Sequence, residues 1–256
     1  MKVSIVTTCR NRIKTLPETV ESVLSQDYDD IEYIVTDGAS TDGTLEYLES
    51  HRDKITQIVS EKDKGIYDGL NKGLRLATGD IVGLLHSDDT YYSTDTISLI
   101  VNEFKRTGAD LVYANGIFVR AEDTNYVVRD WVSGGYEKGN LRKGWLPLHT
   151  TVFIRREVLE KVGYYDVKYH ISADTDWLLR ALYVNSLKVA YLDAYVVKMK
   201  MGGASTSFRT TRQKWGEDLR IYESYGIPQY LSLSLKIAQK IPQFVKARMK
   251  HMMNMY

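Results

Sequence analysis

The chain has 256 residues, enough for one large domain or a domain with an appendage, and 43% of them are hydrophobic and 26% charged. This composition excludes a wholly disordered chain, a collagen-like chain and a disulfide-stapled scaffold. The 34 basic and 33 acidic residues give a net charge of +1, so we expect no nucleic-acid partner. A single cysteine, Cys9, favours a reducing compartment. We expect neither a signal peptide nor a transmembrane helix, and we predict a cytoplasmic protein.

Apolar runs alternate with amphipathic segments through the first ninety residues. Runs rich in Ile and Val predict strands at residues 3–8, 31–36, 55–60 and 80–86. Helical spacing of apolar residues predicts helices between them at residues 15–24, 44–51 and 65–77. The sequence Thr15-Leu16-Pro17-Glu18 predicts a capping box at the start of the first helix. The alternation indicates a largely parallel sheet covered on both faces, with ligands at the carboxyl ends of its strands.

The rest of the chain is less regular. Its patterns predict helices at residues 95–106, 156–162 and 174–185, and strands at residues 109–119, 150–154 and 189–199. Residues 120–148 show no readable pattern and are interpreted as a loop over the site. Residues 202–207 predict a flexible break before a polar helical region. We therefore place the main domain at residues 1–204, with halves 1–90 and 91–204, and a helical extension at residues 205–256.

Polar side chains follow each of the first four predicted strands. Asn11 and Arg12 follow the first strand, Asp37 follows the second, residues 61–65 follow the third, and Ser87-Asp88-Asp89 follows the fourth. Because the carboxyl ends of parallel strands meet at one edge of a sheet, we expect all four clusters on one rim.

The rim motifs do not match common nucleotide or hydrolase signatures. The sequence contains no G-x-G-x-x-G, no P-loop and no G-x-S-x-G, which disfavours hydride transfer, P-loop phosphoryl transfer and α/β-hydrolase chemistry. The adjacent acids Asp88 and Asp89 repel one another unless a cation joins them, and oxygen ligands suit Mg²⁺ or Mn²⁺. An Asx turn or a helix cap is the structural alternative for either acid. Their position after an apolar, central strand favours the metal.

Two further acids flank the turn after the second predicted strand. Asp42 is expected to cap the helix that begins near Thr44. Asp37 ends the strand at the rim, where its carboxylate could accept hydrogen bonds from a base or a ribose. We assign structure to Asp42 and function to Asp37.

Four groups of motifs, in this order, resemble family 2 glycosyltransferases of the GT-A fold. They are Val3–Thr8 with Asn11-Arg12, Asp37–Thr44, Asp63–Asp68 with Asn71-Lys72-Gly73, and Ala77–Asp80 with Ser87-Asp88-Asp89. The resemblance implies an αβα sandwich around a mostly parallel mixed sheet, in which residues 1–90 bind a nucleotide sugar and residues 91–204 an acceptor. It also implies sugar transfer from a nucleotide diphosphate sugar, with UDP favoured, inversion at the anomeric carbon and Mg²⁺ or Mn²⁺ as cofactor.

The resemblance assigns roles to individual rim residues. Thr8 and Asp37 match positions that hold the base and the ribose, and Asp63 and Lys64 match a loop that closes on the nucleotide. Asp88 would face the ribose, and Asp89 would bind the metal. The implied nucleotide-sugar site comprises Thr8, Asn11, Arg12, Asp37, Asp63, Lys64 and Asp88.

Two residues of the second half complete the implied site. Asp174, in a segment similar to the family's acidic helix start, takes the place of the catalytic base, although Ala173 replaces the usual Glu before it. Inverting transfer needs a carboxylate that accepts the acceptor's hydroxyl proton; a first-turn helix acid is the structural alternative. His149 matches a position that is often His, and would bind the metal, touch the acceptor, or serve only as a turn histidine.

The predicted function is transfer of a sugar to a saccharide or lipid-linked acceptor in surface polysaccharide assembly. The role in surface polysaccharide assembly is implied by the resemblance alone. One alternative is a non-catalytic nucleotide- or glycan-binding module, against which the presence of Asp37, Asp88, Asp89 and Asp174 argues. Another is a sugar nucleotidyltransferase, which would need a glycine-rich loop after the first strand, where this chain has no glycine.

The end of the chain carries its own pattern. Residues 229–256 contain five basic residues and no acidic one, and an apolar stripe runs through Ile237, Ile241, Phe244, Val245, Met249 and Met252. Pro242 predicts two short helices instead of one. One interpretation is a helix with a solvated cationic face, packed on its own domain or on the twin subunit of a homodimer. The other is an interfacial helix on anionic lipid, which would make the protein peripheral at the inner face of the plasma membrane.

Overall fold

The computed structural model describes residues 1–185, 187–202 and 208–253. Its strands are β1 Val3–Cys9, β2 Ile31–Asp37, β3 Gln57–Ser60, β4 Ile81–Leu84, β5 Thr90–Tyr91, β6 Leu111–Val119, β7 Val127–Trp131, β8 Phe153–Arg155 and β9 Val189–Lys200. Its α-helices are α1 Leu16–Leu24, α2 Thr44–Glu49, α3 Ile66–Leu76, α4 Thr96–Thr107, α5 Lys138–Leu141, α6 Arg156–Val162, α7 Ala173–Leu179, α8 Phe208–Ser224, α9 Gln229–Ala238 and α10 Ile241–Met252. The short turns η1 His149–Thr151 and η2 Arg180–Val184 are 3₁₀- and π-helical. The break predicted at residues 202–207 lies, from residue 203 on, outside the described residues.

The described strands form one mixed sheet in the order β3-β2-β1-β4-β8-β6-β9-β5, with β7 paired to β6. Strands β1 to β4 are parallel, in a register that aligns Cys9 with Asp37 at the ends of β1 and β2. Strand β8 is antiparallel to both β4 and β6, whereas β9 runs parallel to β6. The predicted parallel half is therefore confirmed, and the antiparallel strands β5, β7 and β8 make the sheet mixed.

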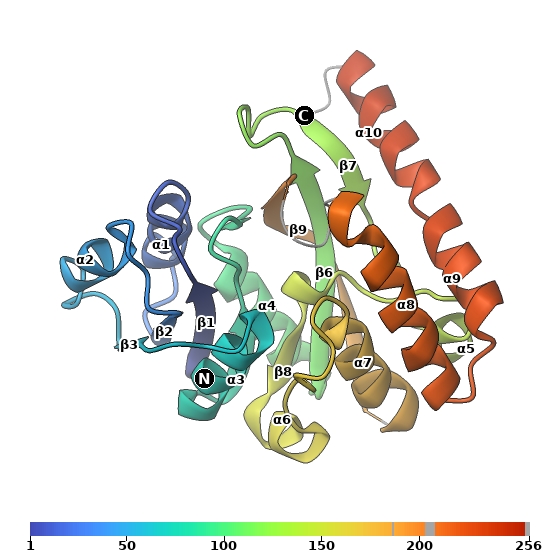
Figure 1. Cartoon of the computed structure of the whole chain (residues 1–256), viewed down its shortest axis with the longest axis horizontal. Helices are drawn as coiled ribbons and strands as arrows, with labels where there is room; N and C mark the ends of the chain where they lie inside the picture. The colour runs from blue at the N-terminus through green and yellow to red at the C-terminus, as the bar shows by residue number, and fades with distance from the viewer. Residues whose placement is uncertain (186, 203–207, 254–256) are drawn as a thin grey trace.

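Helices cover both faces of this sheet (Figure 1). Alternate strand residues point to opposite faces, so that Val6 and Ile34 pack with α3, α6 and α7 in one cluster, while Ile5 and Val35 pack with α1, α2 and α4 in another. Helix α8 adds the buried Tyr222 to the first cluster. The result is the αβα sandwich expected from the sequence.

Glycines allow α3 to lie directly on β1. A Cβ atom at Gly69 would lie 2.3 Å from Thr8 Oγ1, and one at Gly73 would lie 2.4 Å from Val6 Cγ1. Both distances are far below van der Waals contact, so any larger residue would push the helix off the strand. The four-residue glycine spacing in α3 therefore serves close packing and brings the start of α3 to the rim beside Thr8.

The predicted capping box at α1 was wrong. Thr15 precedes α1, but its hydroxyl donates to the backbone carbonyl of Ser87 at 2.8 Å and makes no cap hydrogen bond. Glu18 instead pairs with Lys200. The sequence pattern is local, whereas Ser87 and Lys200 reach these side chains only in the folded sheet. The predicted cap at Asp42 was also wrong, because Gly43, in a left-handed conformation, is the N-cap of α2; Asp42 still has a structural role, since its Oδ1 accepts the backbone N–H of Thr44 at 3.1 Å.

The segment interpreted as a loop, residues 120–148, contains β7 and α5. Strand β7 extends the sheet beside β6, and α10 lies against it (Figure 1).

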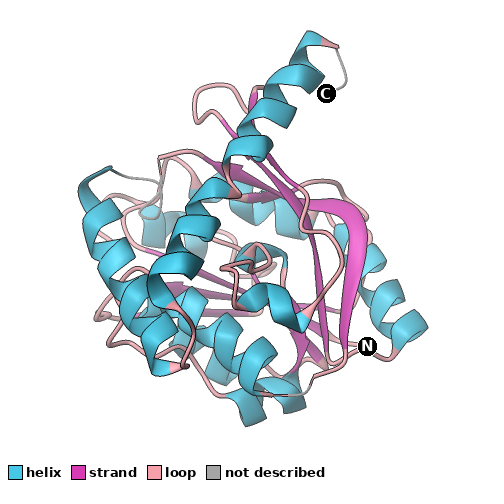
Figure 2. Ribbon diagram, turned by 90° about the vertical axis from the view of Figure 1, so that its right-hand side faces the viewer, coloured by secondary structure: helices cyan, strands magenta, loops and turns pink. Residues whose placement is uncertain are grey.

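Helices α9 and α10 follow one another along one side of the molecule (Figure 2). The boundary between them falls just before Pro242, which confirms the prediction of two short helices. In the described part of the chain, no helix is both long enough and apolar enough to cross a membrane.

Two cations of these helices face the protein, whereas Arg248 is exposed. Lys236 pairs with the buried Asp218 at 3.0 Å, and Lys250 pairs with the buried Asp130 at 2.8 Å. The apolar stripe faces outward instead: the side chains of Ile241, Val245, Met249 and Met252 are 50% to 73% exposed. Packing of the helix on its own domain is therefore confirmed for α10, which lies on β7, whereas a fully solvated cationic face is wrong, because two buried acids attract Lys236 and Lys250 inward.

Candidate active site

Side chains from distant parts of the chain line one pocket at the carboxyl ends of β1 and β4. The pocket has a volume of about 110 Å³. Arg12 follows β1, Asp88 and Asp89 follow β4, His149 lies in η1, and Asp174 lies in the first turn of α7; all five line it. The structure thus brings together five residues that the sequence predicted for one site.

Asp89 is the most deeply buried acid of this pocket, with 2% exposure. Its Oδ1 accepts the backbone N–H of Lys200 at 3.3 Å, and its Oδ2 has no hydrogen-bond partner among the described residues. Burial, and then the charge of Asp88, raise the pKa of Asp89 well above its usual range. A buried carboxylate in this state needs a proton or a cation, so Asp89 fits a divalent ion.

The protein supplies few further ligands for such an ion. In the residues that the structure describes, no group of three or more His, Cys, Asp or Glu is arranged around a metal position. Mg²⁺ commonly takes one or two carboxylates from the protein and the remainder from substrate phosphates and water. The two carboxylates of Asp88 and Asp89 match this pattern of one or two protein ligands.

His149 connects Asp174 to a second histidine. Its Nδ1 lies 3.4 Å from Asp174 Oδ2, and its Nε2 lies 2.8 Å from His86 Nε2. Burial lowers the pKa of His149 to about 4 and also lowers the pKa of His86, so both rings are neutral at pH 7. With Nδ1–H of His149 directed at the carboxylate, the proton between the rings is assigned to His86. Both ring nitrogens of His149 are therefore engaged with protein groups.

Asp174 remains reachable from the pocket, because its side chain is 23% exposed. Its Oδ1 accepts the backbone N–H of Thr175 at 2.9 Å and the hydroxyl of Tyr67 at 3.4 Å. Burial raises the pKa of Asp174, but the contact with His149 and the charges of Lys214 and Lys236 outweigh burial and lower the pKa below its ordinary value. The carboxylate is ionised at neutral pH, as a general base must be.

Helix α8 holds the loop that leads into Asp174. The buried carboxylate of Glu217 accepts backbone N–H groups of His170, Ile171 and Ser172 at 2.9 to 3.1 Å. Sequence reasoning missed Glu217, because an acid within a polar helix carries no sign that it contacts a loop 45 residues earlier.

Asp37 lies at the rim but does not open into the pocket. It is 2% exposed, and its Oδ2 accepts the backbone N–H of Ser40 at 3.0 Å and the hydroxyl of Ser60 at 2.6 Å. Its Oδ1 faces the thiol of Cys9 at 3.7 Å. The carboxylate thus ties together the ends of β1, β2 and β3.

The remaining predicted residues form the neighbouring part of the rim. Asn11 Oδ1 accepts the backbone N–H of Thr41 at 2.9 Å, and Asp63 Oδ1 accepts that of Gly65 at 3.1 Å. Thr8 is buried against Gly69, whereas Lys64 is exposed. These four residues do not line the pocket that holds Asp89. They lie at or just after the ends of β1 and β3, beside the strand ends that the Asp37 carboxylate holds together.

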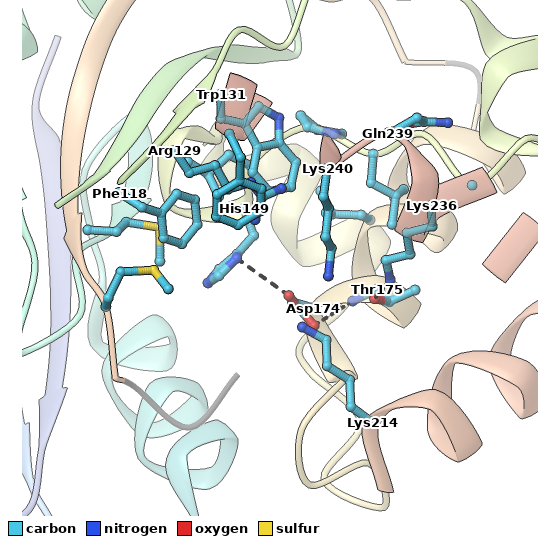
Figure 3. Close-up of a pocket in the computed structure, with 18 of the residues that line it drawn as sticks. Phe118, Arg129, Trp131, His149, Asp174, Thr175, Lys214, Lys236, Gln239 and Lys240 are labelled. Carbon is cyan, nitrogen blue, oxygen red and sulfur yellow. Dashed lines mark hydrogen bonds and ion pairs between the residues drawn. The ribbon is translucent and has the colours of Figure 1, made fainter. Parts of the chain in front are cut away.

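A second cavity, of about 260 Å³, shares His149 and Asp174 with the first. Four cationic side chains line it, from β7, α8, α9 and the turn between α9 and α10: Arg129, Lys214, Lys236 and Lys240. The side chains of Lys214 and Lys240 point into the same space as the Asp174 carboxylate (Figure 3). Sequence reasoning missed this cluster, since it counted Lys236 and Lys240 only among the basic residues of the C-terminal segment 229–256.

Comparison with known proteins places these features in a family. A model of glycosyl transferase family 2 matches residues 4–163. The chain is 29% identical to a PGL/p-HBAD biosynthesis glycosyltransferase of Mycobacterium bovis over 209 residues, which cover 80% of this chain and 79% of the relative. It is 32% identical to an uncharacterised glycosyltransferase of Mycobacterium tuberculosis over 188 residues, covering 71% of this chain and 69% of the relative.

Solved glycosyltransferase structures share the fold. Staphylococcus aureus TarS 1–349 in complex with UDP-GlcNAc matches with a TM-score of 0.67 at 18% identity, covering 86% of this chain and 65% of TarS, slightly less than two thirds of its length. A mannosyltransferase of Pyrobaculum calidifontis in complex with GDP-Man and Mn²⁺ matches with a TM-score of 0.65 at 21% identity, covering 96% and 73%. The fold is thus GT-A. Because the family model covers more than half of the sequence, the chain belongs to glycosyltransferase family 2.

Proposed function

We propose that this chain transfers a sugar, with inversion, from a nucleotide diphosphate sugar to an acceptor hydroxyl. The observation that carries the proposal is that the ionised Asp174 and the buried Asp89 line the same pocket. Asp174 accepts the hydroxyl proton as the acceptor oxygen attacks the anomeric carbon. His149 keeps the carboxylate in place through the contact at 3.4 Å.

The metal belongs to the donor side of the site. Asp89, with its unpartnered buried Oδ2, would hold Mg²⁺ or Mn²⁺. Such an ion, when bound, supplies charge neutralisation for the departing diphosphate. We assign Asp88 to the ribose and Arg12 to the donor, since both line the pocket with Asp89. His149 is a weaker candidate for a metal ligand than the sequence suggested, because its nitrogens face Asp174 and His86.

The nucleotide is assigned to the loops beside this pocket. Thr8, Asn11, Asp63 and Lys64 surround the rim that Asp37 ties together, and we propose that base and ribose lie there. Ser40 and Ser60 already donate hydrogen bonds to the Asp37 carboxylate. Asp37 would therefore contact the nucleotide only if the nucleotide replaced one of these donors. UDP is favoured, in line with the UDP-GlcNAc complex of TarS, and GDP is the competing nucleotide, in line with the GDP-Man complex of the mannosyltransferase.

The acceptor is proposed to be a saccharide or a lipid-linked molecule used in surface polysaccharide assembly. The mycobacterial relatives are also named for a biosynthetic role, PGL/p-HBAD biosynthesis. The outward apolar stripe of α10 supports a position at a membrane surface, with the protein peripheral to the inner face of the plasma membrane. A twin subunit is the competing occupant of that stripe.

The proposal is tested by nucleotide binding and by product stereochemistry. A thermal-shift panel of UDP, GDP, dTDP and CDP with Mn²⁺ should raise the melting temperature for one nucleotide, since a ligand of the folded state stabilises by RT ln(1 + [L]/Kd). Proton NMR of the product made from the matching donor should show the inverted anomeric configuration. Retention would refute inversion, and the absence of stabilisation by any nucleotide would refute the donor class.

A further inference from the structure

The cavity beside Asp174 collects positive charge within a largely apolar wall. Arg129 is 7% exposed and its Nε donates to Gln243 Oε1 at 2.5 Å. Its guanidinium lies 4.2 Å from the ring centroid of Trp131 and 4.8 Å from that of Phe118. Figure 3 shows both rings beside His149 in the wall of the cavity.

Nearby acids leave part of this charge uncompensated. Asp174 is the acid among the described residues that line the cavity, and Asp218 pairs with Lys236 at 3.0 Å. Asp174 is the acid that acts most strongly on Lys214, so the charge left uncompensated is that of Arg129 and Lys240, which have no carboxylate within ion-pair distance among the described residues. Burial lowers the pKa of Arg129 to about 10. The pKa of Lys240 is lowered to about 8, first by burial and then by the charges of Lys214, Arg129 and Lys236. The charge of Asp218 opposes this shift without cancelling it. A cation such as Lys240, which burial and its cationic neighbours disfavour, is stabilised by an anion placed beside it.

We propose that this cavity binds an anionic group of the acceptor, a phosphate or a carboxylate, while a neighbouring hydroxyl reaches Asp174. The proposal rests on the proposed function, since it names the class of acceptor for that reaction. The shared wall of His149 and Asp174 gives the geometric basis, because a molecule in the cavity lies next to the base. The excess of about two positive charges matches a phosphate better than a carboxylate.

The donor's own diphosphate is the other anion that could reach these cations. The acids that suit the donor's metal, Asp88 and Asp89, line only the first pocket, whereas Arg129, Lys214, Lys236 and Lys240 line only the second. The second cavity also has the aromatic side chains Trp131 and Phe244, which the first pocket lacks and against which a sugar ring can pack. At about 260 Å³ the cavity admits one charged sugar unit more readily than an extended chain.

The test is calorimetric titration of inorganic phosphate into the full chain, with and without saturating nucleotide and Mn²⁺. Lys240→Met removes one charge from the cavity and keeps the length of the side chain. Arg248→Met is the matched control, because Arg248 is an exposed cation of α10 that lines neither cavity. Lys240→Arg keeps the charge. A charge-assisted contact leads us to expect roughly tenfold weaker phosphate binding in Lys240→Met and wild-type binding in the other two variants.

The outcomes separate the acceptor from the donor. Phosphate that still binds when nucleotide and Mn²⁺ are present, and that weakens only in Lys240→Met, supports the acceptor site. Displacement of phosphate by the nucleotide assigns the cations to the donor diphosphate and overturns the proposal. Equal binding to wild type and Lys240→Met, or no phosphate binding, also overturns it. Nucleotide binding itself, measured in the same titrations, reports on the proposed function separately, because it does not require the second cavity.

Discussion

Glu217 accepts the backbone N–H of Ser172 at 2.9 Å, two residues before Asp174. A helix that follows the sheet thereby controls the start of the helix that presents the base. Glu217→Gln keeps the shape and one acceptor oxygen but removes the charge that three backbone N–H groups share. We expect transfer to fall about tenfold, because charge-assisted hydrogen bonds contribute about 1.5–3 kcal/mol.

The measurement is kcat and KM for the donor at fixed acceptor. A positioning role lowers kcat and leaves the donor KM unchanged, whereas general unfolding lowers the active fraction and the melting temperature together. Glu223→Gln, an exposed acid of the same helix, is the control and should match wild type. A drop in donor affinity as large as the drop in kcat would contradict a role confined to Asp174.

Asp174→Asn tests the base directly. The amide keeps the shape of the side chain but cannot accept the proton, so transfer should fall by roughly 10²- to 10⁴-fold while nucleotide binding persists. Turnover is measured with the matching donor, and nucleotide affinity by titration. Transfer at nearly the wild-type rate would leave Asp174 as an acid of the first helical turn and nothing more.

Asp89→Asn tests the metal site. The neutral amide should be tolerated at this buried position, because burial already disfavours the charged carboxylate. Without the carboxylate we expect loss of activity and loss of the Mn²⁺-dependent part of nucleotide binding, with the melting temperature of the nucleotide-free protein retained. EDTA should have the same effect on the unchanged protein. Full turnover in EDTA would refute metal dependence.

Glu32 supplies a pH-dependent stability test at the opposite end of the strands from the rim. Its carboxylate accepts hydrogen bonds from Lys2 Nζ at 2.8 Å, Ser4 Oγ at 2.5 Å and the backbone N–H of Thr78 at 2.7 Å. Burial raises its pKa, but these bonds outweigh burial and lower the pKa from 4.5 to about 2. Since the folded pKa lies below the unfolded one, the stabilisation is complete above pH 4.5 and is lost as the pH falls towards 2.

Glu32→Gln should therefore cost on the order of 2 kcal/mol at pH 7, allowing for the partial exposure of Lys2, and much less at pH 3. Urea denaturation of both proteins at the two pH values measures the difference. A cost that is the same at pH 7 and pH 3 would show that the charge of Glu32 contributes nothing. Transfer activity at pH 7 should be unchanged, because Glu32 is remote from the pocket.

The exposed stripe of α10 predicts membrane association through apolar contact. Replacing Ile241, Val245, Met249 and Met252 by Gln should abolish sedimentation with anionic vesicles, whereas Arg248→Gln should weaken the partition only about fivefold, since a basic residue near such a surface contributes about 1 kcal/mol. Deletion of the tail is a poorer test, because it also removes Lys236 and Lys240 from the cavity beside Asp174. Unchanged sedimentation of the Gln variant, with a shift from dimer to monomer, would assign the stripe to a twin subunit.

Local sequence patterns predicted the N-terminal half of this protein well. Strand and helix periodicities depend on neighbouring residues, so the predicted strands that became β1, β2 and β4 and the helix that became α3 were recognisable without the fold. The rim followed from topology, because parallel strands end at one edge, and it brought Arg12, Asp88 and Asp89 into one pocket. The family resemblance, beyond the four ordered motif groups, added Asp174 and His149, which periodicity alone would have left as a helix acid and a turn residue.

Only the tertiary structure decided which side of the tail faces the protein. Amphipathicity defines an apolar and a cationic side of α10, but burial of Asp130 and Asp218 elsewhere in the chain draws Lys250 and Lys236 inward and leaves the apolar side exposed. The same packing brings Arg129, Lys214 and Lys240 beside Asp174. Arg129 is more than eighty residues away from both lysines in the sequence. Such contacts depend on which distant surfaces meet, and a pattern read along one segment contains no information about its partner.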